Sequence, residues 1–204
     1  MGFYARRVLP RLINHAMQQP PIRRLREAFV GAAEGRVLEL GVGAGGNLPF
    51  YRRDLELLIG IDPSPELLER ARKHVPWTHF PVQLEEGSAE ELPFEDQTFD
   101  CVVTTWTLCS VRDPARALTE ARRVLRPGGR LLFLEHGRSP EAGVERWQRR
   151  IEPFWRPLAG GCHLTRPVDR LVEEAGLITR DLETGHFVRG PKPFTFHYRG
   201  IAAR

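Results

Sequence analysis

The stretch that decides the fold is residues 37–45, which read VLELGVGAG. Its first four residues form a short apolar run that ends in glycines, a pattern typical of a buried strand in a parallel sheet. Glycines let the backbone turn sharply and approach a ligand at places where any Cβ atom would clash. In an open parallel sheet such a turn lies at the carboxyl end of a strand, where ligands bind. The stretch therefore predicts a first strand followed by a ligand-binding loop.

Similar apolar runs recur along the chain and alternate with helical patterns. Ser64-Pro65 and Asp113-Pro114 each join an N-cap residue to a proline suited to the first helical position. Alternation through short turns indicates βαβ units and a mostly parallel sheet. We therefore expect an α/β fold of three layers, α/β/α, around a mostly parallel seven-stranded sheet. The expected strands are residues 37–40, 57–61, 82–85, 100–106, 130–135, 178–183 and 196–202, and the expected helices are residues 65–74, 114–125, 147–155 and 167–175.

The length of 204 residues is room for one ordinary domain, and no repeat, linker or low-complexity tract divides it. Residues 1–34 form a helical, arginine-rich lead-in that Pro20-Pro21 interrupts. We expect an N-terminal helical lid segment over residues 1–35 and one main domain over residues 36–204.

The charge balance is basic, with 30 Lys and Arg against 26 Asp and Glu, and all the cations except Lys73 and Lys192 are arginines. Such a balance raises the question of whether the protein binds nucleic acid or an anionic membrane surface. The arginines are scattered over the solvent faces of several expected elements, however, as a compositional bias would give. We expect no nucleic-acid partner, and a peripheral membrane contact of the N-terminal helix stays open.

Three cysteines, at positions 101, 109 and 162, form no CxxC pair and no metal-ligand spacing. An odd, sparse set is typical of a reducing compartment and predicts neither a disulfide scaffold nor a metal site. The chain has no run of about eighteen apolar residues, and no apolar segment follows the first arginines as in a secretory signal. These observations predict a cytoplasmic protein.

The glycine loop and an acidic residue point to a nucleoside-containing cofactor. Asp62 ends the second expected strand, where a carboxylate can accept hydrogen bonds from both hydroxyls of a ribose. The loop satisfies two patterns: GxGxxG, which is typical of dinucleotide sites, and GxGxG with Glu39 two positions before it. On the glycines alone, both cofactor classes stay open.

The rest of the chain favours one of them. Residues 37–45 resemble motif I of the class I S-adenosylmethionine-dependent methyltransferases, and residues 60–64 (GIDPS) resemble the ribose-binding turn of that family. Residues 87–94 (GSAEELPF) are similar to its adenine loop, and residues 123–129 (RVLRPGG) to its turn before strand five. The resemblance implies a Rossmann-like fold, S-adenosyl-L-methionine as cofactor and S-adenosyl-L-homocysteine as product. The cofactor-binding residues that it implies are Glu39, Gly41, Gly43, Gly45, Asn47, Asp62, Pro63, Ser88, Ala89 and Thr105, where Ser88 stands in place of an aspartate of many quinone-pathway relatives.

The second half resembles a narrower group, the alkyl-thiol S-methyltransferases. Glu135-His136, Trp147, Trp155 and residues 161–166 (GCHLTR) recur in that group in this order. The resemblance implies a small, apolar acceptor, with a thiol favoured. Residues 1–34 are too polar for the hydrophobic anchor of its membrane-bound members. The first 136 residues resemble quinone-pathway enzymes as well, so C- or O-methylation of a quinone precursor or similar metabolite is the alternative, and a nicotinamide-dependent reductase is a remote one.

The candidate catalytic residue is His136, at the end of the fifth expected strand. A thiol acceptor must become a thiolate before it attacks, and a histidine can take that proton near neutral pH. The alternative to a catalytic role for His136 is a structural hydrogen bond, and the alternative to a substrate contact for the residues named next is packing. The candidate substrate residues are Tyr4, Trp106, Trp155, Cys162 and His163.

Overall fold

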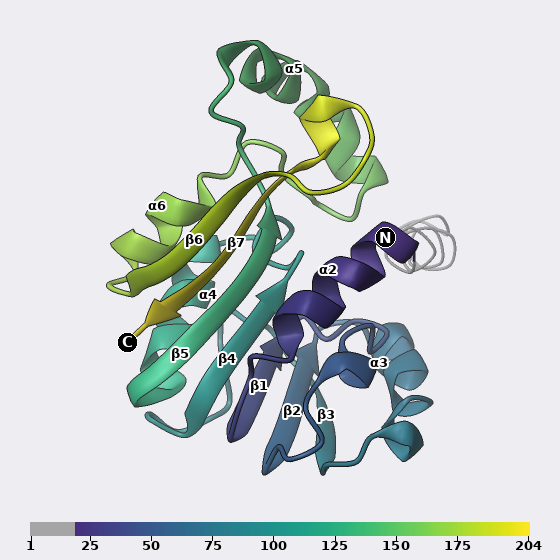
Figure 1. Cartoon of the computed structure of the whole chain (residues 1–204), viewed down its shortest axis with the longest axis vertical. Helices are drawn as coiled ribbons and strands as arrows, with labels where there is room; N and C mark the ends of the chain where they lie inside the picture. Colours follow the sequence, from purple (N-terminus) through teal and green to yellow (C-terminus); the bar gives the residue numbers. More distant parts are fainter. Residues whose placement is uncertain (1–18) are drawn as a thin grey trace.

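The computed structural model describes residues 19–204, and Tyr4 lies outside them. Its centre is a seven-stranded sheet in the order β3-β2-β1-β4-β5-β7-β6 (Figure 1). Neighbouring strands from β3 to β5 are parallel, whereas β7 runs antiparallel to both β5 and β6. This sheet confirms the predicted fold class. The strands are β1 Arg36–Leu40, β2 Leu57–Asp62, β3 Val82–Glu86, β4 Phe99–Thr105, β5 Leu125–His136, β6 Ile178–His186 and β7 Phe196–Ala203.

Helices connect the strands and cover both faces of the sheet (Figure 1). The two predicted caps hold, because Ser64 Oγ accepts from the Leu67 N–H at 3.3 Å and Asp113 Oδ1 accepts from the Arg116 N–H at 3.0 Å. The helices are α2 Pro20–Val30, α3 Pro65–Arg72, α4 Pro114–Val124, α5 Ala142–Leu158 and α6 Val168–Glu174, with short 3₁₀ turns η2 Leu48–Phe50, η3 Val75–Trp77 and η4 Lys192–Phe194. Across residues 19–204, none of these helices is long and apolar enough to cross a bilayer.

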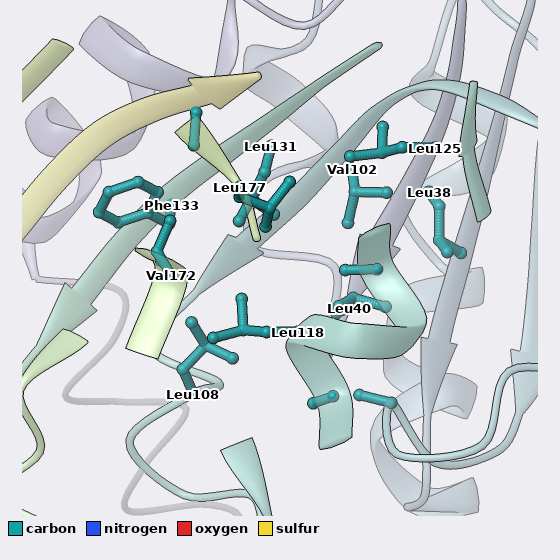
Figure 2. Close-up of a cluster of buried hydrophobic side chains, with 14 of the residues drawn as sticks. Leu38, Leu40, Val102, Leu108, Leu118, Leu125, Leu131, Phe133, Val172 and Leu177 are labelled. Carbon is teal, nitrogen blue, oxygen red and sulfur yellow. The ribbon is translucent and has the colours of Figure 1, made fainter. Parts of the chain in front are cut away.

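Two apolar clusters hold these layers together. The larger packs α4 and α6 against one face of the sheet through side chains such as Leu118, Val172 and Phe133 (Figure 2). The smaller places Phe29 and Val30 of α2 on the other face. Helix α2 is thereby fixed across the sheet beside the carboxyl end of β1, where the glycine loop begins.

Two elements differ most from the sequence prediction. Strand β5 begins at Leu125 and not at residue 130, because the turn at residues 127–129 forms an irregularity within the strand. At this irregularity the pairing with β4 shifts from Phe99↔Leu125 to Cys101↔Arg130. Helix α5 is longer than expected and continues through Pro153 and Pro157. The division of the chain at residue 35 stays a prediction, since most of the lead-in lies outside the described residues.

Candidate active site at the carboxyl ends of the strands

The loop after β1 is held in a conformation that requires glycine. Gly41, Gly43 and Gly45 have φ angles of 69°, 54° and 77°, in the left-handed region that L side chains rarely adopt. A Cβ atom on Gly41 would overlap the Thr107 side chain. A Cβ atom on Gly43 would meet only the Gly41 carbonyl oxygen, at 3.9 Å. The loop is thus packed against the protein at Gly41 and open at Gly43.

Asp62 ends β2 and faces this loop. Its Oδ2 accepts from the Gly43 N–H at 2.9 Å, and its Oδ1 accepts from the Ser64 N–H at 2.9 Å. Burial raises the pKa of this carboxyl, which is 7% exposed, and the two N–H groups oppose that shift. Each oxygen keeps a lone pair, so a ribose at the open side of the loop would find two acceptors.

Three of the predicted cofactor residues form one buried network instead of facing the open side of the loop. Asn47 Nδ2 donates to Glu39 Oε1 at 2.8 Å and to Thr105 Oγ1 at 3.0 Å. Tyr51 donates its hydroxyl to Glu39 Oε2 at 2.9 Å. Burial raises the pKa of Glu39 to about 7. The network ties the glycine loop to β1 and β4, and Tyr51 is a member that the sequence prediction missed.

Arg26 of α2 lies on top of this network. Its Nη1 donates to Asn47 Oδ1 at 3.2 Å, its guanidinium lies 5.1 Å from the centre of the Trp106 ring, and a Cβ atom on Gly46 would overlap it. The residue is 7% exposed, so the expectation that the arginines of the lead-in lie on solvent faces is wrong for Arg26. Its buried Nε has no hydrogen-bond partner within residues 19–204. The signal in the sequence was its position on the same helical face as Phe29 and Val30.

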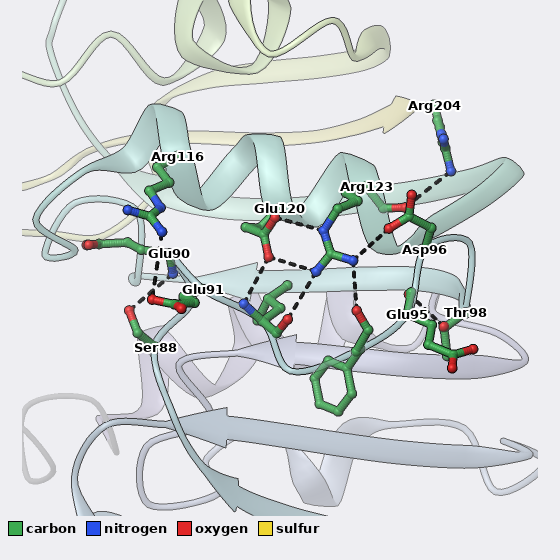
Figure 3. A network of polar contacts seen from close by, with 12 residues as sticks. Ser88, Glu90, Glu91, Glu95, Asp96, Thr98, Arg116, Glu120, Arg123 and Arg204 are labelled. Carbon is green, nitrogen blue, oxygen red and sulfur yellow. Dashed lines mark hydrogen bonds and ion pairs between the residues drawn. The ribbon is translucent and has the colours of Figure 1, made fainter.

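The predicted adenine loop is held by side chains of α4. Arg123 binds Glu120 and Asp96 and also donates to the carbonyls of Leu92 and Phe94 (Figure 3). Ser88 Oγ accepts from the Glu90 N–H at 3.1 Å. Ala89 is 6% exposed. The network therefore fixes the main chain of this loop, while the Ser88 hydroxyl makes a local turn contact.

The loop after β4 is held by a buried carboxylate that the sequence prediction did not single out. Glu135 accepts from Thr104 Oγ1 at 2.7 Å and from the N–H groups of Thr107 and Cys109 at 3.0 and 3.3 Å. Burial raises the pKa of Glu135 to about 7. Within this loop Trp106 has a φ of 51°, a conformation that a bulky residue adopts only where its surroundings impose it.

A line of rings leads from Trp106 away from the glycine loop. The Trp106 ring lies edge-on to His197, with centroids 5.9 Å apart, and His197 lies 5.5 Å from His136. Register places the two histidines opposite each other on β5 and β7. Burial lowers the pKa of His197 to about 4, and its Nδ1 contacts the Thr195 carbonyl at 2.7 Å. His197 is therefore neutral at physiological pH.

The line ends at a cysteine. Cys162 Sγ lies 3.6 Å from His136 Nδ1, and Cys109 and Trp155 are its other neighbours. These neighbours lower the pKa of Cys162 well below its usual range, with the Cys109 thiol the largest cause, whereas the pKa of Cys109 is raised. His136 is 5% exposed, and its Nε2 has no hydrogen-bond partner in the described part of the chain.

The structure thus brings together four of the predicted catalytic and substrate residues, namely His136, Trp106, Trp155 and Cys162. His163 turns away from them and contacts Glu152 Oε1 at 3.1 Å. His197 and Cys109 are members that sequence reasoning missed, because their places follow from strand pairing and a loop contact between distant segments.

Comparison with known proteins adds to this geometry. Residues 38–133 match the family described as a methyltransferase domain. The chain is 36% identical over 157 residues to the thiol S-methyltransferase TMT1B of Rattus norvegicus, an alignment that covers 74% of this chain and 63% of that protein. It is 42% identical over 135 residues to the phosphatidylethanolamine N-methyltransferase of Cereibacter sphaeroides, covering 64% of this chain and 66% of that protein.

Among solved structures, a methyltransferase from Thermotoga maritima, described as a possible histamine N-methyltransferase, is similar throughout. The two chains are 25% identical with a TM-score of 0.69, and the match covers 96% of this chain and 98% of that one. The chain belongs to the class I S-adenosylmethionine-dependent methyltransferases. It spans about three fifths of the length of the thiol S-methyltransferase that it matches.

Family membership decides between the two glycine patterns in favour of GxGxG. S-adenosylmethionine is the cofactor of this family, and the residues present fit it. The cradle at Gly43 is open, Asp62 presents two carboxylate oxygens, and the buried Arg26 Nε lies beside the loop without a partner within residues 19–204. A nucleoside amino acid requires acceptors for its ribose hydroxyls, a glycine-lined backbone that it can approach closely, and a cation for its carboxylate.

Proposed function

We propose that the protein transfers the methyl group of S-adenosylmethionine to the thiol of a small, apolar acceptor. Bound S-adenosylmethionine supplies a methyl group on a sulfonium sulfur, and the thioether that remains after transfer is a good leaving group. The chain therefore has to position two molecules, exclude water and remove one proton. Similarity to the rat thiol S-methyltransferase supports the acceptor class, and the apolar rings beside the site support its character.

Separate groups would hold the separate parts of the cofactor. Asp62, followed by Pro63, would receive the ribose hydroxyls, while Gly41, Gly43 and Gly45 leave room for the chain of the cofactor. Ala89 and Ser88 would border the adenine through their main chain. Arg26 would neutralise the carboxylate of the methionine part, since its buried Nε has no acceptor within residues 19–204.

The observation that carries the proposal is the surroundings of the two ring nitrogens of His136. With a hydrogen on Nδ1, the ring donates toward Cys162 Sγ, 3.6 Å away, and Nε2 is left as an acceptor. This buried Nε2 has no partner within residues 19–204, so it is free for the proton of an acceptor thiol. Cys162 would then serve His136 as a carboxylate serves the histidine of a catalytic triad, by fixing the tautomer and stabilising the charged ring.

The test compares His136→Asn with His79→Asn, whose side chain is exposed and far along the chain from the site. With an alkyl thiol as acceptor, we expect His136→Asn to lower kcat by about 100-fold, the lower range of general-base contributions, with unchanged affinity for S-adenosylhomocysteine. With a thiophenol, which is already ionised near neutral pH, the loss should be much smaller. An equal loss with both thiols would contradict a role for His136 as base.

A second candidate is N-methylation of a lipid amine, which the similarity to phosphatidylethanolamine N-methyltransferase supports. Helix α5 presents Trp147, Phe154 and Leu158 to solvent, with exposed fractions of 56%, 75% and 60%, and Arg150 lies over Trp147. Such a face is suited to a lipid surface. Methyl transfer to an alkyl thiol, to phosphatidylethanolamine vesicles and to a polyprenyl phenol, measured side by side, separates the three acceptor classes.

A further inference from the structure

Two cysteines that are distant in the sequence meet at the end of the ring line. Cys109 belongs to the loop after β4, and Cys162 to the segment between α5 and α6. The His163 N–H donates to the Cys109 carbonyl at 2.7 Å, which joins the two segments. Backbones joined by a hydrogen bond lie about 5 Å apart, and disulfides span Cα atoms about 5.5–6 Å apart. The Cys109 and Cys162 thiols are neighbours within this arrangement.

The two sulfurs differ in access and in charge. Cys162 is partly exposed, whereas Cys109 is 3% exposed. Cys109 also has Trp106 as a partner, since its thiol lies 3.5 Å from the Trp106 carbonyl oxygen. One thiol is therefore reachable from solvent and stabilised as a thiolate, and a second stands behind it with its proton retained. The titratable and charged groups around the pair are His136 and Glu135 from β5, Glu152 from α5, and Arg166 from the segment before α6.

We propose that Cys162 and Cys109 form a thiol–disulfide exchange site for disulfides of small thiols. In the first step the Cys162 thiolate attacks one sulfur of a disulfide RSSR, which forms the Cys162–SR bond and releases RS⁻. In the second step Cys109 gives its proton to the released thiolate and attacks Cys162 Sγ. The Cys109–Cys162 bond forms, and the second RS⁻ leaves and takes up from solvent the proton that Cys162 lost on ionisation. Overall, RSSR is reduced to two thiols and the two cysteines are oxidised to one disulfide.

The exchange has a consequence for methyl transfer, which rests on the proposed function. In the disulfide, Cys162 Sγ carries no charge and no longer accepts from His136 Nδ1. His136 then loses the partner that fixes its tautomer, and we expect thiol methylation to fall at least tenfold until a dithiol reductant restores it. Small disulfides are the oxidised form of the acceptor class proposed above, so the site would couple methylation to the redox state of that pool.

The experiment uses 2-hydroxyethyl disulfide as the probe and intact-protein and peptide mass spectrometry as the readout. We expect the wild-type chain to lose two hydrogens and to yield a Cys109–Cys162 cross-linked peptide. Cys109→Ser should stop at a mixed disulfide on Cys162, and Cys162→Ser should form neither product. Cys101→Ser is the matched control, because Cys101 is 1% exposed and burial raises its pKa to about 12, so its loss should leave the exchange unchanged.

A second measurement requires no variant. Brief iodoacetamide treatment of the wild-type chain at pH 6 should alkylate Cys162 about tenfold faster than a simple thiol, with Cys101 and Cys109 spared. Three results would each overturn the proposal: a wild-type mixed disulfide that never closes, exchange by Cys162→Ser at the wild-type rate, or uniform slow alkylation. Since mass detects the exchange directly, these failures are distinct from absence of thiol methylation, which would overturn the proposed function alone.

Discussion

The two ends of the site satisfy their buried polar groups in different ways. At the cofactor end, Glu39, Asn47, Tyr51 and Thr105 bind one another in a closed network. At the acceptor end, His136 Nε2 is buried without a partner within residues 19–204. Since buried polar groups are costly unless they are paired, the four-residue network is complete by itself, whereas His136 Nε2, like the Arg26 Nε that lies over the network, awaits a ligand. The cofactor is common to the family, and the acceptor is where its members differ.

The largest effects should come from breaking the closed end. Gly41→Ala places a methyl group against Thr107 at a φ of 69°, so we expect it to lower the free energy of unfolding by about 2–4 kcal/mol and to abolish binding of S-adenosylhomocysteine. Gly43→Ala has room within the protein, so it should fold with a cost of about 1 kcal/mol yet bind at least 100-fold more weakly. Thermal unfolding and titration calorimetry measure the two effects.

Gly128→Ala is the matched control for these variants. Its φ is 79° and its Cβ would have nothing within 4 Å, so it carries the conformational cost alone. It should match Gly43→Ala in stability while keeping wild-type affinity for S-adenosylhomocysteine. Wild-type affinity in Gly43→Ala would mean that the cofactor does not approach the loop at this glycine.

A smaller effect is expected where the two ends meet, at Arg26. If its guanidinium binds the methionine carboxylate, Arg26→Met should lower the affinity for S-adenosylhomocysteine by about 10- to 100-fold, which is the range expected for hydrogen bonds to charged groups. The same substitution should leave the affinity for 5′-methylthioadenosine unchanged, because this ligand lacks the carboxylate. Arg24→Met, on the exposed side of the same helix, is the control. An equal loss for both ligands would assign Arg26 to holding α2 and the loop rather than to the carboxylate.

The same division explains what the sequence could predict. The strands, the caps at Ser64 and Asp113 and the glycine loop depend on neighbours within a few residues, so their pattern is visible in the chain itself. His197 reaches His136 only through the pairing of β7 with β5, and Cys109 reaches Cys162 only through a loop contact. Arg26 was missed for another reason, because its place on the buried face with Phe29 and Val30 is visible in the helical spacing but an arginine is expected to lie in solvent. The acceptor end is thus built from contacts that no local pattern encodes.

The two ends should also respond to pH in opposite directions, which is the smallest of the expected effects. Folding raises the pKa of Glu39 to about 7, so its contribution to stability is present at low pH and is lost as pH rises from about 4.3 to about 7. Folding lowers the pKa of His197 to about 4, so its contribution is present above about 6.5 and is lost as pH falls toward 4.

Glu39→Gln and His197→Asn separate the two contributions, because each removes one titrating group. The Tm of Glu39→Gln should fall less than that of the wild-type chain when pH rises from 5 to 7.5. The Tm of His197→Asn should fall less than that of the wild-type chain when pH drops from 7 to 5, and each difference should be a few degrees. The pH slope is the readout rather than the absolute Tm, since both variants also lose packing or a hydrogen bond at every pH. Glu135, whose pKa burial also raises to about 7, shares the direction of Glu39 and remains in both variants, so it cancels in the comparison. Parallel pH slopes for wild type and His197→Asn would mean that His197 titrates alike in the folded and unfolded chains, and the neutral state assigned to His197 would fall with that result.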